Sequence, residues 1–105
     1  MSRVTTVLLS FSVAESGFDR DAEVSRKLDG VNALLAKLQH APLRCLTAQM
    51  SGDKVPHTHT FGGAYSWLPD DGLLDAVKRI EWAHPNAVVL TMHFDFEPLL
   101  IWRPA

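Results

Sequence analysis

The chain lacks the features that mark several large classes of protein. Its 105 residues include one cysteine, Cys45, so no internal disulfide can form, and we expect a reducing, cytoplasmic environment. No apolar run approaches the ~18 residues that a membrane-spanning helix needs, and we expect no membrane partner. The opening segment MSRVTTVLLSFSVAES is apolar only in short pieces and rich in β-branched residues. It therefore predicts a strand rather than a signal peptide.

Neither sign of charge dominates the sequence. The chain has 10 Lys and Arg against 12 Asp and Glu, which gives a formal net charge of −2 at pH 7. The basic residues are scattered singly or in pairs, whereas binding to a phosphate backbone needs a basic stripe that displaces counterions. We therefore expect no nucleic-acid partner.

The motifs of common enzyme classes are missing as well. There is no G-x-S-x-G segment, and the glycines form neither a P-loop nor a dinucleotide fingerprint. Cys45 lies in an apolar stretch with no His nearby in sequence, so we interpret it as a buried structural thiol. The adjacent Asp70 and Asp71 are typical of helix caps. These observations argue against an enzyme.

The periodicity of the apolar residues is informative. Alternating or continuously apolar segments predict strands over residues 4–13, 43–50, 57–67, 87–94 and 99–102. Apolar residues three and four apart predict helices from about residue 21 to 40 and from about 73 to 82. Gly30 costs the first helix about 1 kcal/mol relative to Ala, and we interpret it as a sign of close packing. Gly62 and Gly63 suggest a bulge or a close approach by a neighbouring backbone.

This order of elements predicts one α+β domain over residues 1–105. It is the βαββαβ, or ferredoxin-like, arrangement with a mostly antiparallel sheet and an extra C-terminal strand. Each helix has a single apolar stripe, so we expect both helices on one face of the sheet and an open second face. The fold carries many unrelated functions, so it does not by itself indicate one.

The segment HTHTFGG raises the question of a metal site. On a strand, His57 and His59 point the same way with Cα atoms about 6.6 Å apart, which suits a zinc-like ion. The best third ligand is His93, but the first strand would lie between the strand of His59 and the strand of His93, which would then be about 9.6 Å apart. A metal could bridge these strands only over small side chains of the first strand, and Ser10 and Ser12 are small. Two ligands do not make a zinc site, so we favour a solvent-exposed strand start and no cofactor.

Aromatic and apolar residues gather in the second half of the chain. Surface Trp and Tyr are frequent anchors of protein interfaces, and an open sheet face must be solvated or covered. The run Leu-Leu-Ile-Trp near the C-terminus has more apolar residues than one buried face needs. The alternative is that these rings build the core. The interface candidates are Leu99, Ile101, Trp102, Tyr65 and Trp67.

The sequence thus predicts a small, non-enzymatic protein-interaction domain. We expect either a self-associating protein, such as a dimer, or an inhibitor or immunity-type partner of another protein. The alternative function is binding of a metal or small ligand through the His57 and His59 pair.

Overall fold

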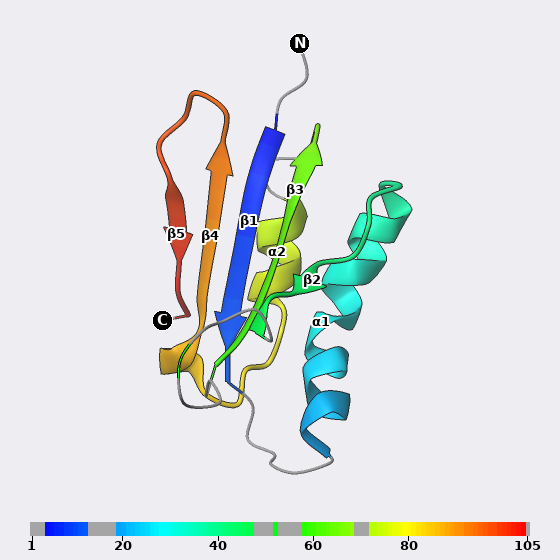
Figure 1. Ribbon diagram of the computed structural model, residues 1–105, viewed down its shortest axis with the longest axis vertical. Helices are drawn as coiled ribbons and strands as arrows, with labels where there is room; N and C mark the ends of the chain where they lie inside the picture. Colours follow the sequence, from blue (N-terminus) through cyan, green and yellow to red (C-terminus); the bar gives the residue numbers. More distant parts are fainter. Residues whose placement is uncertain (1–3, 13–18, 48–51, 53–57, 69–71, 105) are drawn as a thin grey trace.

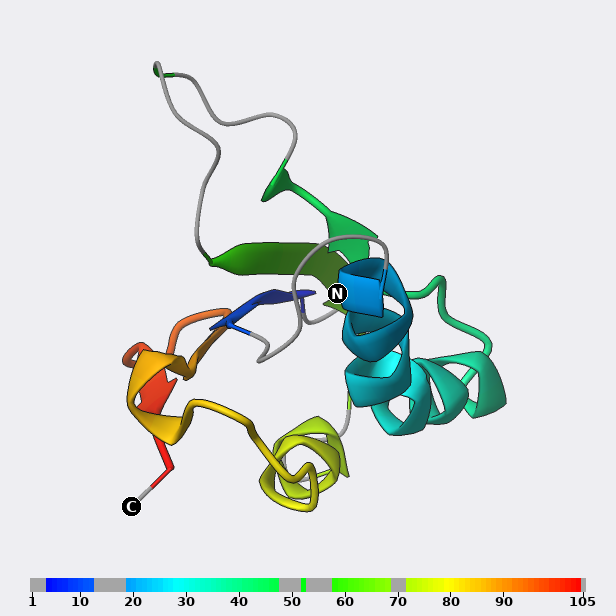
Figure 2. The same cartoon turned by 90° about the horizontal axis from the view of Figure 1, so that it is seen from below.

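A computed structural model describes residues 4–12, 19–47, 52, 58–68 and 72–104. It contains one five-stranded sheet in the order β2-β3-β1-β4-β5, and every pair of neighbouring strands is antiparallel. Both helices cover the same face of this sheet (Figures 1 and 2). The ferredoxin-like arrangement with an added C-terminal strand is therefore confirmed. The elements are β1 (Val4–Phe11), α1 (Asp19–Lys37), β2 (Arg44–Cys45), β3 (His59–Ser66), α2 (Gly72–Lys78), the 3₁₀ helix η2 (Pro85–Ala87), β4 (Val89–Phe94) and β5 (Leu100–Trp102).

The central strand β1 separates the two faces. Its residues alternate because successive side chains of a strand point to opposite sides. Thr5, Val7, Leu9 and Phe11 are fully buried, whereas the residues between them are exposed or half-buried. Leu9 lies opposite Phe61 of β3 and Leu90 of β4, which are buried too.

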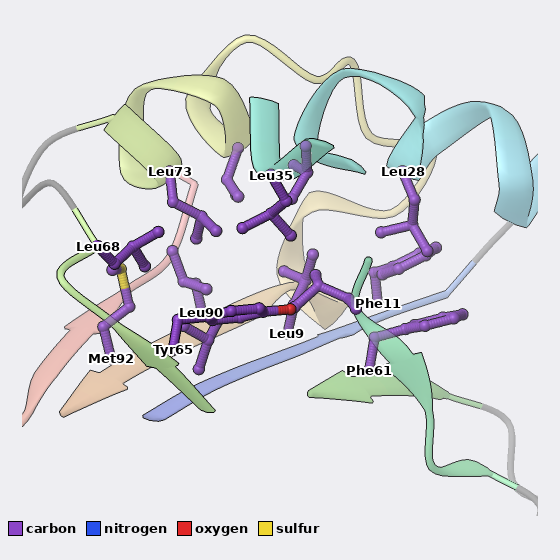
Figure 3. Packing of buried hydrophobic residues seen from close by; sticks show 14 of the residues in the cluster. Leu9, Phe11, Leu28, Leu35, Phe61, Tyr65, Leu68, Leu73, Leu90 and Met92 are labelled. Carbon is purple, nitrogen blue, oxygen red and sulfur yellow. The ribbon is translucent and has the colours of Figure 1, made fainter. Parts of the chain in front are cut away.

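The core lies between the sheet and the two helices, as Figure 3 shows. The predicted stripe of α1 supplies Leu28, Val31 and Leu35, and α2 supplies Leu73 and Val77; all five are buried. The helical spacing of apolar residues therefore identified the buried side of both helices correctly.

Two elements are shorter than the sequence predicts. The helix α2 ends at Lys78 rather than near residue 82. The chain leaves the helix there, and Trp82 packs on Phe11 with 5.0 Å between ring centroids. The strand β2 has only two residues, Arg44 and Cys45, and residues 48–50 of the predicted strand lie outside the described part of the chain.

The paired glycines of β3 allow close approaches rather than a bulge. The pairing with β1 runs without interruption through Leu8–Gly62 and Val7–Gly63. A Cβ added at Gly63 would lie 2.5 Å from the Tyr65 hydroxyl, because the ring of Tyr65 folds back over it. A Cβ added at Gly62 would lie 2.9 Å from Cδ2 of Leu8.

The expectation of close packing at Gly30 is wrong. A Cβ added there meets no atom within 4 Å, so this glycine faces open space although it lies in the middle of α1. Nothing that packs inside the described structure requires glycine at this position.

We therefore predict that Gly30→Ala raises the free energy of unfolding by about 0.5–1 kcal/mol, because alanine loses less backbone entropy in a helix. Urea unfolding followed by circular dichroism measures the change. A loss of stability would mean that the added methyl group meets a neighbour.

Candidate functional site

Neither described helix covers the second face of the sheet (Figure 2). Apart from His93 on β4, the strands β3, β1, β4 and β5 present small, hydroxyl-bearing or apolar residues on this face. Arg44, at the β2 edge, is the only charged residue among the paired positions of this face. The face positions, assigned from the strand register, are Val4, Thr6, Leu8, Ser10, Arg44, Thr60, Gly62, Ala64, Ser66, Val89, Thr91, His93 and Ile101.

All exposed large hydrophobic residues among the described ones belong to this face or to segments at the end of the sheet where β1 begins. Figure 1 shows that the end of β3 and the turn between β4 and β5 lie at this end. None of them lies on a helix. Exposed apolar side chains gathered on one side of a protein are typical of sites of association. We call this set the open-face patch: Val4, Leu8, Trp67, Phe96, Leu99 and Ile101.

The end of the sheet is held in a defined position. The Asp95 amide donates to the Val4 carbonyl oxygen at 3.2 Å, and the Val4 amide donates to Oδ2 of Asp95 at 3.0 Å. The Glu97 amide closes the turn by donating to the Phe94 carbonyl oxygen at 3.1 Å. These bonds fix the turn that carries Phe96 to the start of β1.

Two aromatic residues of the patch adopt a backbone conformation that favours glycine. Trp67 has φ 60° and Phe96 has φ 64°, in the left-handed region that costs roughly 1–2 kcal/mol for an L-residue. Their side chains are 66% and 92% exposed, so burial within the chain offsets little of this cost. Such strain is found at sites kept for function rather than for stability.

The outer edge of the sheet at β5 is poorly suited to adding another strand. The strand has three residues, with Pro98 two positions before it and Pro104 two positions after it. Short edge strands and prolines discourage pairing with a further chain, because proline cannot donate to the ladder. The open-face patch is therefore positioned for contact through its side chains.

Three of the predicted interface residues are at the surface. Leu99 and Ile101 are 54% and 60% exposed, and Trp67 is exposed as well. Trp102 is half-buried and packs against the core. Tyr65 was predicted to lie at the interface, but it is only 6% exposed and lies in the core. The centroid of its ring is 5.2 Å from that of His40.

Phe96, Leu8 and Val4 are not among the predicted interface residues. Val4 and Leu8 alternate with the buried residues of β1, so the alternation contained a signal for them. For Phe96 the signal was an aromatic residue just before a proline-containing turn.

The candidate metal ligands do not share a face. His59 lies opposite Phe11 on the helix side, with 6.3 Å between ring centroids, and is 6% exposed. His93 lies opposite Thr6 on the open side and is exposed. A site that uses both is therefore incompatible with the register, and His59 is not at a solvent-exposed strand start. His57 lies outside the described residues.

No group of three His, Cys, Asp or Glu in the described part of the chain could hold a metal ion. Cys45 is exposed on the edge strand β2, so the expectation of a buried thiol is wrong. The strand β2 has only two residues and lies at the edge of the sheet, and both of its residues are exposed.

The comparisons with known proteins add no relative. No protein-family model matches the chain, and no curated protein or solved structure matches it either. None of the described helices combines the length and the apolar character needed to cross a membrane. We therefore infer the function from the geometry of the open face.

The buried hydroxyl of Tyr65 gives a prediction, because it has no hydrogen-bond partner among the described residues. Tyr65→Phe should raise the free energy of unfolding at pH 7 by up to about 1 kcal/mol, since it removes an unpaired buried polar group. Burial raises the pKa of the Tyr65 hydroxyl above its usual value of 10.0. The unfolded chain thus ionises first, and stability should fall as the pH rises above 10.

Tyr65 is the only tyrosine, so absorbance at alkaline pH reports its ionisation directly. Parallel urea unfolding of wild type and Tyr65→Phe should show that the tyrosine-dependent part of the alkaline loss is absent from the variant. An ordinary tyrosine titration in the folded protein would contradict the buried placement.

The left-handed aromatic residues give a second prediction. Phe96→Gly should raise the free energy of unfolding by about 0.5–1 kcal/mol, because glycine adopts positive φ without steric cost. Phe96→Ala is the matched control, since it removes the ring but keeps the Cβ atom and should gain nothing. Equal unfolding midpoints for the two variants would show that the backbone at Phe96 is not strained.

Proposed function

We propose that this chain is a protein-interaction domain that associates with a second copy of itself through the open-face patch. The observation that carries the proposal is the placement of the exposed hydrophobic residues. All those that the structure describes lie on the open face or at its end, and two of them, Trp67 and Phe96, adopt strained conformations.

The charge of the face favours a second copy as the occupant. At the paired positions of β3, β1, β4 and β5 there is no Asp, Glu, Lys or Arg. The one charged paired position of the face, Arg44, lies at the β2 edge, so the central parts of two such faces can meet without repulsion between like charges, whereas a strongly charged partner would find little that is complementary there. A two-fold dimer needs a surface that complements itself, and a face whose centre carries no charged side chain meets that condition.

The size of the face sets the expected strength. The five strands contain 27 residues, and at about 3.4 Å per residue and about 4.8 Å per strand they give an area of roughly 440 Å². Two copies would then bury about 900 Å² in total, which is in the range of weak, transient interfaces. We therefore expect a weak, reversible dimer with a dissociation constant in the micromolar range, or about 10⁻⁶ to 10⁻⁴ M.

The aromatic rings at the end of the sheet extend this interface. Trp is among the residues that contribute most to binding energy. Trp67 follows β3 directly, and Phe96 lies in the turn between β4 and β5. Both flank Val4, whose backbone bonds to Asp95 hold the turn in place. They are thus preorganised for contact with a partner, which reduces the entropy that binding must overcome.

We predict that sedimentation equilibrium of the wild type between about 1 and 500 μM, the range around the expected dissociation constant, will show a monomer–dimer equilibrium. Leu8→Arg and Ile101→Arg should each weaken dimerisation at least tenfold, because each places a desolvated charge against an apolar surface. Both residues are exposed in the monomer, so the circular dichroism spectra should remain unchanged.

Ala36→Arg is the matched control, because it adds the same charge at an exposed position of α1. It should leave the dissociation constant unchanged. A wild type that stays monomeric throughout the range would overturn self-association and leave a heterologous protein as the occupant of the patch. Equal weakening by Ala36→Arg would show that net charge, rather than the open face, governs association.

A further inference from the structure

A cleft of about 420 Å³ lies on the helix side of the molecule, between α1 and the C-terminal part of α2 with the residues that follow it. One wall is formed by Arg26, Lys27 and Gly30 of α1, and the other by Ala76, Arg79 and Ile80. Because the helices cover the face opposite to the open-face patch (Figure 2), this cleft is independent of the proposed dimer surface.

The spacing along α1 explains why these side chains line one wall. Positions three and four residues apart lie on the same side of a helix, so Arg26 and Lys27 sit one turn before Gly30. This row runs beside the apolar stripe that fills the core. The row itself is polar apart from Gly30, and it lines the cleft between the two helices.

Gly30 keeps the cleft open. A Cβ at this position would meet nothing within 4 Å, and glycine is among the least favourable residues in a helix interior. Neither packing nor helix propensity accounts for it. A larger side chain would extend into the cleft and reduce its volume, so a bound molecule is a physical reason for glycine at this position.

Two arginines line the cleft, one from each wall. Arg26 belongs to α1 and Arg79 follows α2 directly, and both are exposed. The third basic residue is already engaged, because Nζ of Lys27 donates to the carbonyl oxygen of Glu81. That bond joins the two walls.

The acidic residues of the lining do not cancel this charge. Glu23 is buried and already has an interaction partner, and Glu81 is exposed. Three basic and two acidic residues give the lining a formal charge of +1, whereas the whole chain has −2. The cleft is therefore a basic site on an acidic protein.

We infer that this cleft binds a small organic anion. The guanidinium groups of Arg26 and Arg79 hold its carboxylate or phosphate group through paired, charge-assisted hydrogen bonds. The half-buried side chains of Ala76 and Ile80, which pack against the core, contact the apolar part of the ligand. The volume of the cleft lies in the range of small-molecule sites, about 300–1,000 Å³.

Titrations followed by ¹H–¹⁵N correlation spectra test the inference at protein concentrations where the chain is monomeric. Phenyl phosphate and benzoate are the probes. The probe with the higher affinity shows whether the cleft prefers a phosphate or a carboxylate group. We expect saturable shifts centred on the amides of Gly30 and Arg79. Benzyl alcohol keeps the ring but lacks the charge, and its affinity should be lower than that of the aryl anions by a factor of about ten or more. Inorganic phosphate should bind more weakly than phenyl phosphate, because it lacks the apolar part.

The variants are chosen to keep the fold. The double variant Arg26→Gln and Arg79→Gln should weaken binding about tenfold or more, and Gly30→Leu should abolish it by filling the cleft. Arg103→Gln, an exposed arginine after β5, is the control and should bind like wild type. The inference is overturned if neither aryl anion gives saturable shifts, or if the double variant binds as tightly as wild type.

The outcome is separate from that of the dimer experiment. Leu8→Arg, which disrupts the open face, should still bind the probe with unchanged affinity. If it loses binding, the cleft is not the site, because Leu8 lies on the opposite face of the sheet.

Discussion

The strict alternation of β1 is the constraint on which the rest of the structure depends. Thr5, Val7, Leu9 and Phe11 all point to the helix side and are fully buried. Because β1 pairs with β3 and β4, its register also decides which residues of those strands are buried. Two short amphipathic helices then supply enough apolar surface to cover one side only. A one-sided sheet is the direct result.

The fold could be predicted from the sequence because its strongest signals are periodic. The apolar residues of α1 recur every three and four positions, and Val7, Leu9 and Phe11 alternate in the first strand. Each pattern independently requires one buried side, and the only simple way to satisfy both is two layers. The end of α2 could not be predicted, because Trp82 has the spacing of a helical residue but instead contacts the distant Phe11.

The site was less accessible to sequence reasoning because strand register depends on contacts between distant residues. His59 and His93 are both candidate ligands in the sequence, yet pairing with Phe11 and Thr6 places them on opposite faces. Tyr65 is similarly drawn into the core, where Gly63 leaves room for its ring. The positive φ of Trp67 and Phe96 was not visible either, since sequence patterns assign such turns to Gly or Asn.

The two prolines beside β5 have a consequence for how large an assembly can become. Sheets that accept strands at an edge can grow without limit, and this growth is the route to fibrils. Pro98 and Pro104 bracket the three residues of β5, so that border resists lengthening by a foreign backbone. In the dimer that we propose, the two open faces would cover each other, and the β5 border would offer no ladder on which further copies could add.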